Sequence, residues 1–124
     1  MIYKVGMLCK HFKGKDLLEK NIYRIEQLGV KGTSIDTSLI TYTGEGNLEE
    51  ATDLVVYSNI FQEGKLFCRE YSDISSKLSD EKRAMFNQDM RVQPLTQEEI
   101  DLVNSEDFIK EKTEVVAKKF EKKK

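Results

Sequence analysis

The sequence predicts a mainly β fold, α+β by content: a strongly bent antiparallel sheet or small barrel of about five or six strands. A short inserted helix and a C-terminal helical tail complete it. Three observations predict this fold: strand-like alternation over residues 21–30, a hairpin pattern over 53–71, and helical spacing after residue 96. The chain has 124 residues, which suits a single domain. We expect a small β-barrel domain over residues 1–95 and a helical tail over 96–124, packed on that domain or on a partner subunit.

The opening elements are two strands with a tight turn between them. Residues 5–12 form a short apolar run that ends in alternation, and Gly14 supplies the positive φ of the turn that follows. Residues 21–30 alternate clearly, but their apolar side chains fall on both faces, which indicates a twisted strand at a barrel corner. Residues 39–43 are strand-like by propensity, and Asn47 is placed to cap one short turn of helix.

The clearest pattern is a β-hairpin. Residues 53–61 and 65–71 are β-branched and aromatic runs, and only Gln62, Glu63 and Gly64 separate them. A glycine at the end of so short a loop predicts a left-handed backbone at Gly64.

Helix start signals dominate the last third of the chain. Ser79 begins a predicted helix that runs to about residue 87, with two acids in its first turn. A short edge strand follows over residues 91–95, because Pro94 removes a donor from the ladder. Thr96 and Glu99 then form a capping box, which predicts another helix start.

The final helix is amphipathic. It begins after Ser105, and it ends in a basic stretch from Lys118 to Lys124. Three- and four-residue spacing marks its buried stripe: Phe108, Lys112, Val115, Val116 and Phe120. We expect this stripe to pack on the β domain or to build a homo-oligomer through residues 106–120.

Composition excludes several classes of protein. Twenty basic and twenty-two acidic side chains give a formal charge of -2, which argues against a general binder of long nucleic acid. Two cysteines do not make a disulfide framework. No apolar run of about 18 residues and no signal-peptide pattern occur, so we expect no membrane partner and a cytoplasmic location. Gly44-x-Gly46 lacks the third glycine and the lysine that phosphate loops use, and it predicts a surface turn.

Catalytic and metal chemistry have a thin basis in the sequence. His11 is the only histidine, and no nucleophile motif accompanies it. We therefore predict no catalytic residue, with a small enzyme that uses His11 with Cys9 or Glu70 as an alternative. Cys9, His11 and Cys68 could supply three metal ligands. Structural zinc takes four ligands and favours a C-x-x-C pair, so we predict no metal and no cofactor.

Arg69 is the most informative polar residue of the hairpin. It shares a face with Phe67, and an arginine flanked by aromatic rings can hold phosphate or carboxylate bidentately or stack on a base. The alternative is a cross-strand ion pair with Glu26 or Asp53. We predict a non-enzymatic binding module that recognises an anionic small ligand, a nucleotide or a protein segment. Its ligand-binding residues are basic and aromatic: His11, Lys13, Tyr23, Tyr57, Phe61 and Arg69.

Four phrases, in order along the chain, resemble a bacterial family. They are Lys10–Gly14 (KHFKG), Asn21–Ile25 (NIYRI), Leu54–Tyr57 (LVVY) and Phe67–Arg69 (FCR). Their order resembles the domain-of-unknown-function family numbered 1653, over residues 6 to about 74. The resemblance implies a small SH3-like antiparallel β-barrel, and it implies no known activity, cofactor or catalytic residue. Glu70 stands where the family usually has proline, and residues 31–53 are longer than its usual turn.

Overall fold

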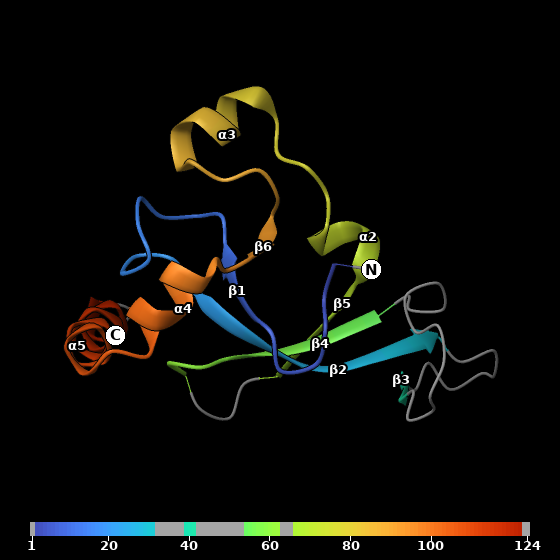
Figure 1. Ribbon diagram of the computed structural model, residues 1–124, viewed down its shortest axis with the longest axis horizontal. Helices are drawn as coiled ribbons and strands as arrows, with labels where there is room; N and C mark the ends of the chain where they lie inside the picture. Colours follow the sequence, from blue (N-terminus) through green and yellow to red (C-terminus); the bar gives the residue numbers. More distant parts are fainter. Residues whose placement is uncertain (1, 32–38, 42–53, 63–65, 123–124) are drawn as a thin grey trace.

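The computed structural model describes residues 2–31, 39–41, 54–62 and 66–122. The strands are β1 (Leu8–His11), β2 (Ile22–Lys31), β3 (Leu39–Thr41), β4 (Leu54–Asn59), β5 (Leu66–Glu70) and β6 (Val92–Pro94). The helices described are α2 (Tyr71–Ile74), α3 (Asp80–Phe86), α4 (Gln97–Val103) and α5 (Glu106–Lys122). Figure 1 shows the β2–β4 pair at the centre, with α4 and α5 beyond one end of it and β3 at the other.

The sheet is antiparallel and open. Its strands follow the order β5-β4-β2-β1-β6, and β3 pairs with β2 off this path. In the described part of the chain, β5 and β6 end the path and do not pair with each other. The predicted antiparallel sheet with added helices is confirmed, but the described strands do not close into a barrel. Two features oppose closure: α2 follows β5 at once, and Pro94 removes a donor from β6.

A β-bulge in β2 explains the apolar residues on both of its faces. Ile25 lies opposite Tyr57, and the register then shifts so that Gln27 lies opposite Val56. Because a bulge inserts one extra residue, Ile25 and Leu28 face the same core although they are three residues apart. The bulge also bends the strand, which is the curvature that the sequence pattern suggested.

Two hydrophobic cores cover the two faces of the sheet. The buried members of the first core are Tyr3, Cys9, Tyr23, Ile25, Leu28, Val55, Tyr57, Ile74 and Val92. Those of the second core are Ile22, Leu95, Val103 and Phe108. Ile22 and Tyr23 are adjacent on β2, so they point to opposite faces and place the cores on either side. The Tyr3 hydroxyl lies 3.0 Å from the Ile74 carbonyl oxygen and 2.6 Å from that of Val92, which ties the N-terminal segment to the first core.

Two predictions about strands can be compared with the described residues, and two predictions about turns and caps cannot. The hairpin is confirmed, because β4 and β5 pair antiparallel with Tyr57 opposite Phe67. Pro94 lies on β6, an outer strand of the sheet, as expected. The predicted left-handed Gly64 and the predicted cap at Asn47 lie outside the described residues.

The predicted helix starts are confirmed. The Ser79 side chain accepts a hydrogen bond from the backbone N–H of Lys82 at the start of α3. Asn87 ends that helix in a left-handed conformation with φ of 51°. Thr96 and Glu99 form both hydrogen bonds of a capping box at the start of α4.

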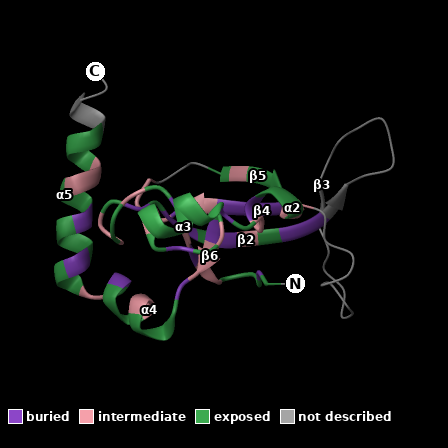
Figure 2. Cartoon of the chain, turned by 90° about the horizontal axis from the view of Figure 1, so that it is seen from above, coloured by how far each residue is buried: buried purple, intermediate pink, exposed green. Residues whose placement is uncertain are grey.

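The expected stripe of α5 is buried in part. Phe108 is buried in the second core, whereas Val115 and Val116 are half-buried. The side chain of Phe120 lies outside the described residues. Figure 2 shows that the buried positions of α5 gather in the half that adjoins α4.

Lys112 attaches α5 to the connection between β1 and β2. Its ammonium donates to the backbone carbonyl oxygens of Leu17, at 3.0 Å, and of Leu18 and Lys20. Only 2% of this residue is exposed. Burial lowers the pKa of Lys112 to about 8. The lysine in the apolar stripe therefore acts as a buried donor to three carbonyl groups.

Lys20 is a second buried lysine. Its Nζ donates to the carbonyl oxygens of Phe12 and Phe86, at 3.1 and 2.9 Å, and to Oε1 of Gln88 at 3.0 Å. The Gln88 amide donates in turn to the carbonyl oxygen of Met90 at 2.8 Å. This network fixes the end of α3 and the segment before β6 against β1.

Candidate anion-binding site

A row of aromatic rings crosses β1, β2, β4 and β5 on the face of the first core. The ring centroids of His11 and Tyr23 are 6.3 Å apart, those of Tyr23 and Tyr57 4.7 Å, and those of Tyr57 and Phe67 5.4 Å. Tyr57 lies opposite Phe67, whereas the other two ring pairs are diagonal neighbours on paired strands, which aromatic side chains can still bridge. Tyr23 and Tyr57 are buried, while His11 and Phe67 are half-buried at the two ends. We call these four residues the ring row.

Arg69 is exposed at the β5 end of the ring row. It follows Phe67 by two residues, so both side chains lie on the same face. Burial raises the pKa of Tyr57, and the nearby positive charge of Arg69 opposes that rise. The same positive charge opposes the rise of the Tyr23 pKa, which is also caused mainly by burial.

Glu26, which the sequence offered as an ion-pair partner for Arg69, bonds to other residues on the opposite face of the sheet. Its Oε1 lies 3.2 Å from Nε of Arg24 and accepts a hydrogen bond from the Ser58 hydroxyl at 2.6 Å. Arg24 and Ser58 lie opposite each other on β2 and β4, and each adjoins a ring-row residue along its strand. They therefore point away from the ring row. Asp53, the other alternative partner, lies outside the described residues.

His11 lies at the end of β1 in a cationic environment. The backbone N–H of Lys13 donates to its Nδ1 at 3.3 Å, so the neutral imidazole carries its proton on Nε2. Burial lowers the pKa of His11, and the positive charges of Lys13, Arg91 and Lys20 lower it further. At neutral pH His11 is thus a hydrogen-bond donor in a region of positive potential, which favours an anion.

Arg69 also lines a hollow of about 630 Å³ beside β5. Arg91, which precedes β6, lines the same hollow. Its Nη1 lies 3.3 Å from Oδ1 of Asp73. Ser72 and Ser76 add hydroxyl groups. The residues that line this arginine hollow are Leu54, Cys68, Arg69, Glu70, Ser72, Asp73, Ser76 and Arg91.

The ion pair in the arginine hollow is open to exchange. The side chains of Arg91 and Asp73 are 47% and 49% exposed. Pairs this exposed contribute about 0–1 kcal/mol, because water screens them. An anionic group that offers two oxygens to a guanidinium can therefore replace Asp73 at small cost.

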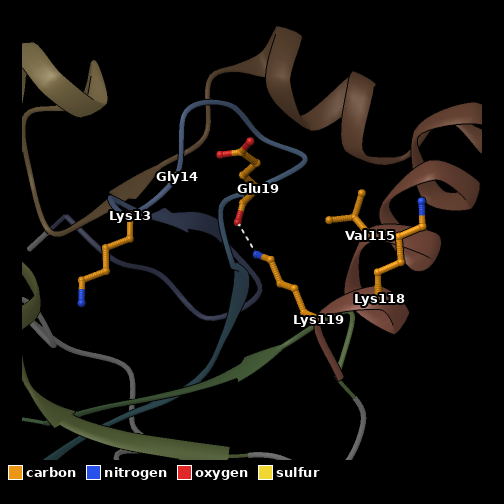
Figure 3. Close-up of a pocket in the computed structure, with 6 residues that line it drawn as sticks. All are labelled: Lys13, Gly14, Glu19, Val115, Lys118 and Lys119. Atoms are coloured by element: carbon orange, nitrogen blue, oxygen red, sulfur yellow. Dashed lines mark hydrogen bonds between the residues drawn. The ribbon is translucent and has the colours of Figure 1, made fainter. Parts of the chain in front are cut away.

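Four of the predicted ligand-binding residues lie in or beside the ring row: His11, Tyr23, Tyr57 and Arg69, with His11 on β1 and Arg69 on β5 at its two ends. Lys13 contacts His11 through its backbone and acts on it through its charge. The Lys13 side chain also lines a different hollow, next to Gly14. Figure 3 shows this side chain pointing away from Lys119 of α5.

Phe61, also predicted as a ligand-binding residue, lies apart from the ring row. Its ring lies 6.3 Å from that of Phe108, and Nζ of Lys112 lies 5.9 Å from its centroid. β4 ends at Asn59, and the chain then turns, so the strand alternation that placed Phe61 no longer applies. Phe61 packs against the second core instead.

The alternative of a catalytic cysteine is opposed by burial. Cys9 is fully buried, and burial raises the pKa of its thiol to about 12, whereas a nucleophilic cysteine needs a lowered pKa. Cys68 lies between Phe67 and Arg69 on β5, so it points to the other face of the sheet. Cys9, His11 and Cys68 are therefore not brought together. Within the described ranges, no group of three or more His, Cys, Asp or Glu residues could hold a metal ion.

The sequence did not indicate Arg91, Ser72 or Ser76 as site residues. Arg91 reaches the hollow because β6 pairs with β1, with Val92 opposite His11. That pairing joins residues about 80 positions apart, so no local pattern encodes it. The signal that was available is modest: an arginine at the first position of the predicted edge strand.

Comparisons of the chain with protein-family models, with curated proteins and with solved structures found no match. Of the helices in the described part of the chain, none is both long and apolar enough to cross a membrane. The site is therefore defined by its own geometry, a pair of arginines at one hollow and a row of rings behind one of them.

Proposed function

We propose that the chain is a non-enzymatic binding module for a flat anionic ligand, such as a nucleotide. One observation carries this proposal: Arg69 lines the arginine hollow together with Arg91 and lies on the same face of β5 as Phe67 of the ring row. A ligand that combines a charged group with a flat ring needs guanidinium and aromatic groups at one place.

The charged group of the ligand lies between the two arginines. Each planar guanidinium offers a fork of N–H donors that fits phosphate or carboxylate. The hydroxyl group of Ser72 adds a neutral donor in the same hollow, whereas the Ser76 hydroxyl donates to the Asp73 carbonyl oxygen at 2.7 Å. The flat part of the ligand stacks on Phe67, whose ring is half-exposed and is itself stacked on Tyr57 with 21° between the planes.

The proposal also includes the resemblance to family 1653, an SH3-like arrangement of the strands and a cytoplasmic location. Support for the resemblance comes from where its phrases fall. They lie on or overlap β1, β2, β4 and β5, which are consecutive neighbours in the sheet.

Isothermal titration calorimetry with three probes tests the function. AMP carries a base and a phosphate, ribose 5-phosphate carries the phosphate alone, and adenosine carries the base alone. We expect AMP to bind more tightly than either of the other two. Arg69→Lys should weaken AMP binding by about tenfold, because the charge stays while the planar fork is lost. Arg24→Lys is the matched control, since Arg24 is on the other face of the sheet and should leave binding unchanged.

Two results would contradict the proposal. One is AMP binding no tighter than ribose 5-phosphate and adenosine, which would mean that the rings and the arginines do not act on one ligand. The other is an Arg69→Lys affinity equal to that of the wild type. Circular dichroism of the variant shows whether the fold is retained.

A further inference from the structure

Helix α5 carries opposite charges at its two ends. Its first half exposes Asp107, Glu111 and Glu114, and its second half exposes Lys118 and Lys119. The helix dipole favours this polarity within one chain. The same polarity also means that two such helices attract each other when they pack antiparallel and repel each other when they pack parallel.

Two hollows lie along one flank of α5, and the loop over residues 13–19 forms the opposite wall of both. The acidic hollow has a volume of about 530 Å³ and is lined by apolar and acidic side chains. Its lining includes Asp16, Leu17, Leu18, Asp107, Phe108 and Glu111. The basic hollow, of about 420 Å³, is lined by Lys13, Gly14, Glu19, Val115, Lys118 and Lys119. Figure 3 shows Lys119 bonded to the backbone oxygen of Glu19, at 3.0 Å, while the ammonium of Lys118 points away from Glu19.

The two hollows are in helical register. Val115 follows Phe108 by seven residues, and Lys118 follows Glu111 by seven, so each pair is two turns apart on the same side of α5. The flank therefore changes from acidic and apolar to basic over about 10 Å of helix axis. A two-fold rotation places the basic part of one copy on the acidic part of another, and such self-complementarity is what a symmetric dimer requires.

We propose that a second copy of this chain binds to this flank, with the two α5 helices antiparallel. Lys118 of each copy lies against Glu111 of the other, and its aliphatic stem covers the Leu17 and Leu18 side chains of the acidic hollow. This alignment puts the Glu114 residues of the two copies next to each other at the two-fold axis. The dimer is a separate property from ligand binding, because the arginine hollow is built from other residues.

Sedimentation equilibrium of the full chain, at several protein and salt concentrations, tests the dimer. We expect a reversible dimer that weakens as salt screens the charges. Glu111→Lys and Lys118→Glu should each weaken it at least about tenfold, because each substitution sets like charges together. The double variant E111K/K118E should restore the dimer. Thr113→Glu, which adds a charge at an exposed position on the far side of the same helix, is the matched control and should have no effect.

Three results would overturn the proposal. The wild type could be monomeric at every concentration. The double variant could fail to restore a dimer that the single variants had weakened. Thr113→Glu could disrupt the dimer as strongly as Lys118→Glu, which would place the interface on another side of α5.

Disulfide cross-linking tests the antiparallel alignment directly. The exposed Cys68 is first replaced in Cys68→Ser, and the buried Cys9 stays protected. In that background Glu114→Cys should form a disulfide-linked dimer on oxidation with diamide, because the two thiols meet at the axis. Thr113→Cys, exposed on the far side of the helix, should remain monomeric under reducing-agent-free electrophoresis. Cross-linking of Thr113→Cys in place of Glu114→Cys would refute the alignment.

Discussion

Lys112→Met removes one buried ammonium and leaves most of the side-chain volume in place. In the wild type this ammonium bonds to the carbonyl oxygens of Leu17, Leu18 and Lys20 in a position that is 2% exposed. Burial lowers the pKa of Lys112 to about 8, against 10.5 for an ordinary lysine. The folded chain therefore loses this proton at a lower pH than the unfolded chain does.

The sign and size of the effect follow from these two pKa values. Between pH 8 and 10.5 the unfolded chain binds more protons than the folded chain, so the wild type gains stability as pH rises through this window. The whole window corresponds to about 3 kcal/mol, of which about 2 kcal/mol falls between pH 7 and 9.5. Methionine does not titrate. The free energy of unfolding of the wild type, relative to that of Lys112→Met, should therefore increase by about 2 kcal/mol over this interval.

Urea unfolding followed by circular dichroism, at both pH values, measures this difference. The free energy of unfolding should fall with urea concentration at the same slope for both proteins, which shows that the same transition is compared. Lys110→Met is the matched control, because Lys110 is exposed on the same helix and its substitution should show no such pH dependence. The reasoning would be refuted if the free energy of unfolding of the wild type, relative to that of Lys112→Met, stayed constant or decreased as the pH rises. It would mean that the three carbonyl oxygens stabilise the ammonium more than burial destabilises it.

Three further substitutions and reactions test the packing. Tyr3→Phe should lower the free energy of unfolding by about 1–2 kcal/mol in urea, because two buried carbonyl oxygens lose the single O–H donor that they share, and unchanged stability would show that its hydroxyl contributes nothing. Thr96→Ala should cost about 1 kcal/mol by thermal denaturation, since it removes the capping oxygen for Glu99, and an unchanged melting temperature would count against the capping box. A thiol reagent should modify Cys68 at once and Cys9 only after unfolding, and equal rates for the two would contradict the burial of Cys9.

The candidate site could be predicted only in part. His11, Tyr23, Tyr57 and Arg69 were predicted as basic and aromatic residues of the β domain, and the pairing of neighbouring strands places them along one row. Phe61 lies apart from them, because the chain turns after Asn59 and packs this ring against the second core. Alternation is reliable within a strand and carries no information beyond its end.

Local interactions in the sequence determined the helix starts and the hairpin. A capping side chain and the N–H group that it accepts are about three residues apart, so Ser79 and Thr96 specify their helices without help from the rest of the fold. The alternation of β4 and β5 likewise reflects neighbours joined by a short connection. These features can be read from sequence because both partners lie within one short window.

Only the tertiary structure determines which residues far apart in the sequence lie close together in space. Arg91 reaches the arginine hollow through the pairing of β6 with β1, and Lys112 finds its carbonyl partners more than 90 residues earlier in the chain. Over the residues that the structure describes, the sheet is open because β5 and β6, at the two ends of its path, do not pair with each other. The sequence of a single strand does not encode that outcome. A lysine in an apolar stripe has the same pattern whether it is solvated or buried. Its role is set by the backbone oxygens that the fold brings within about 3 Å of its nitrogen, because an unpaired ammonium could not remain there.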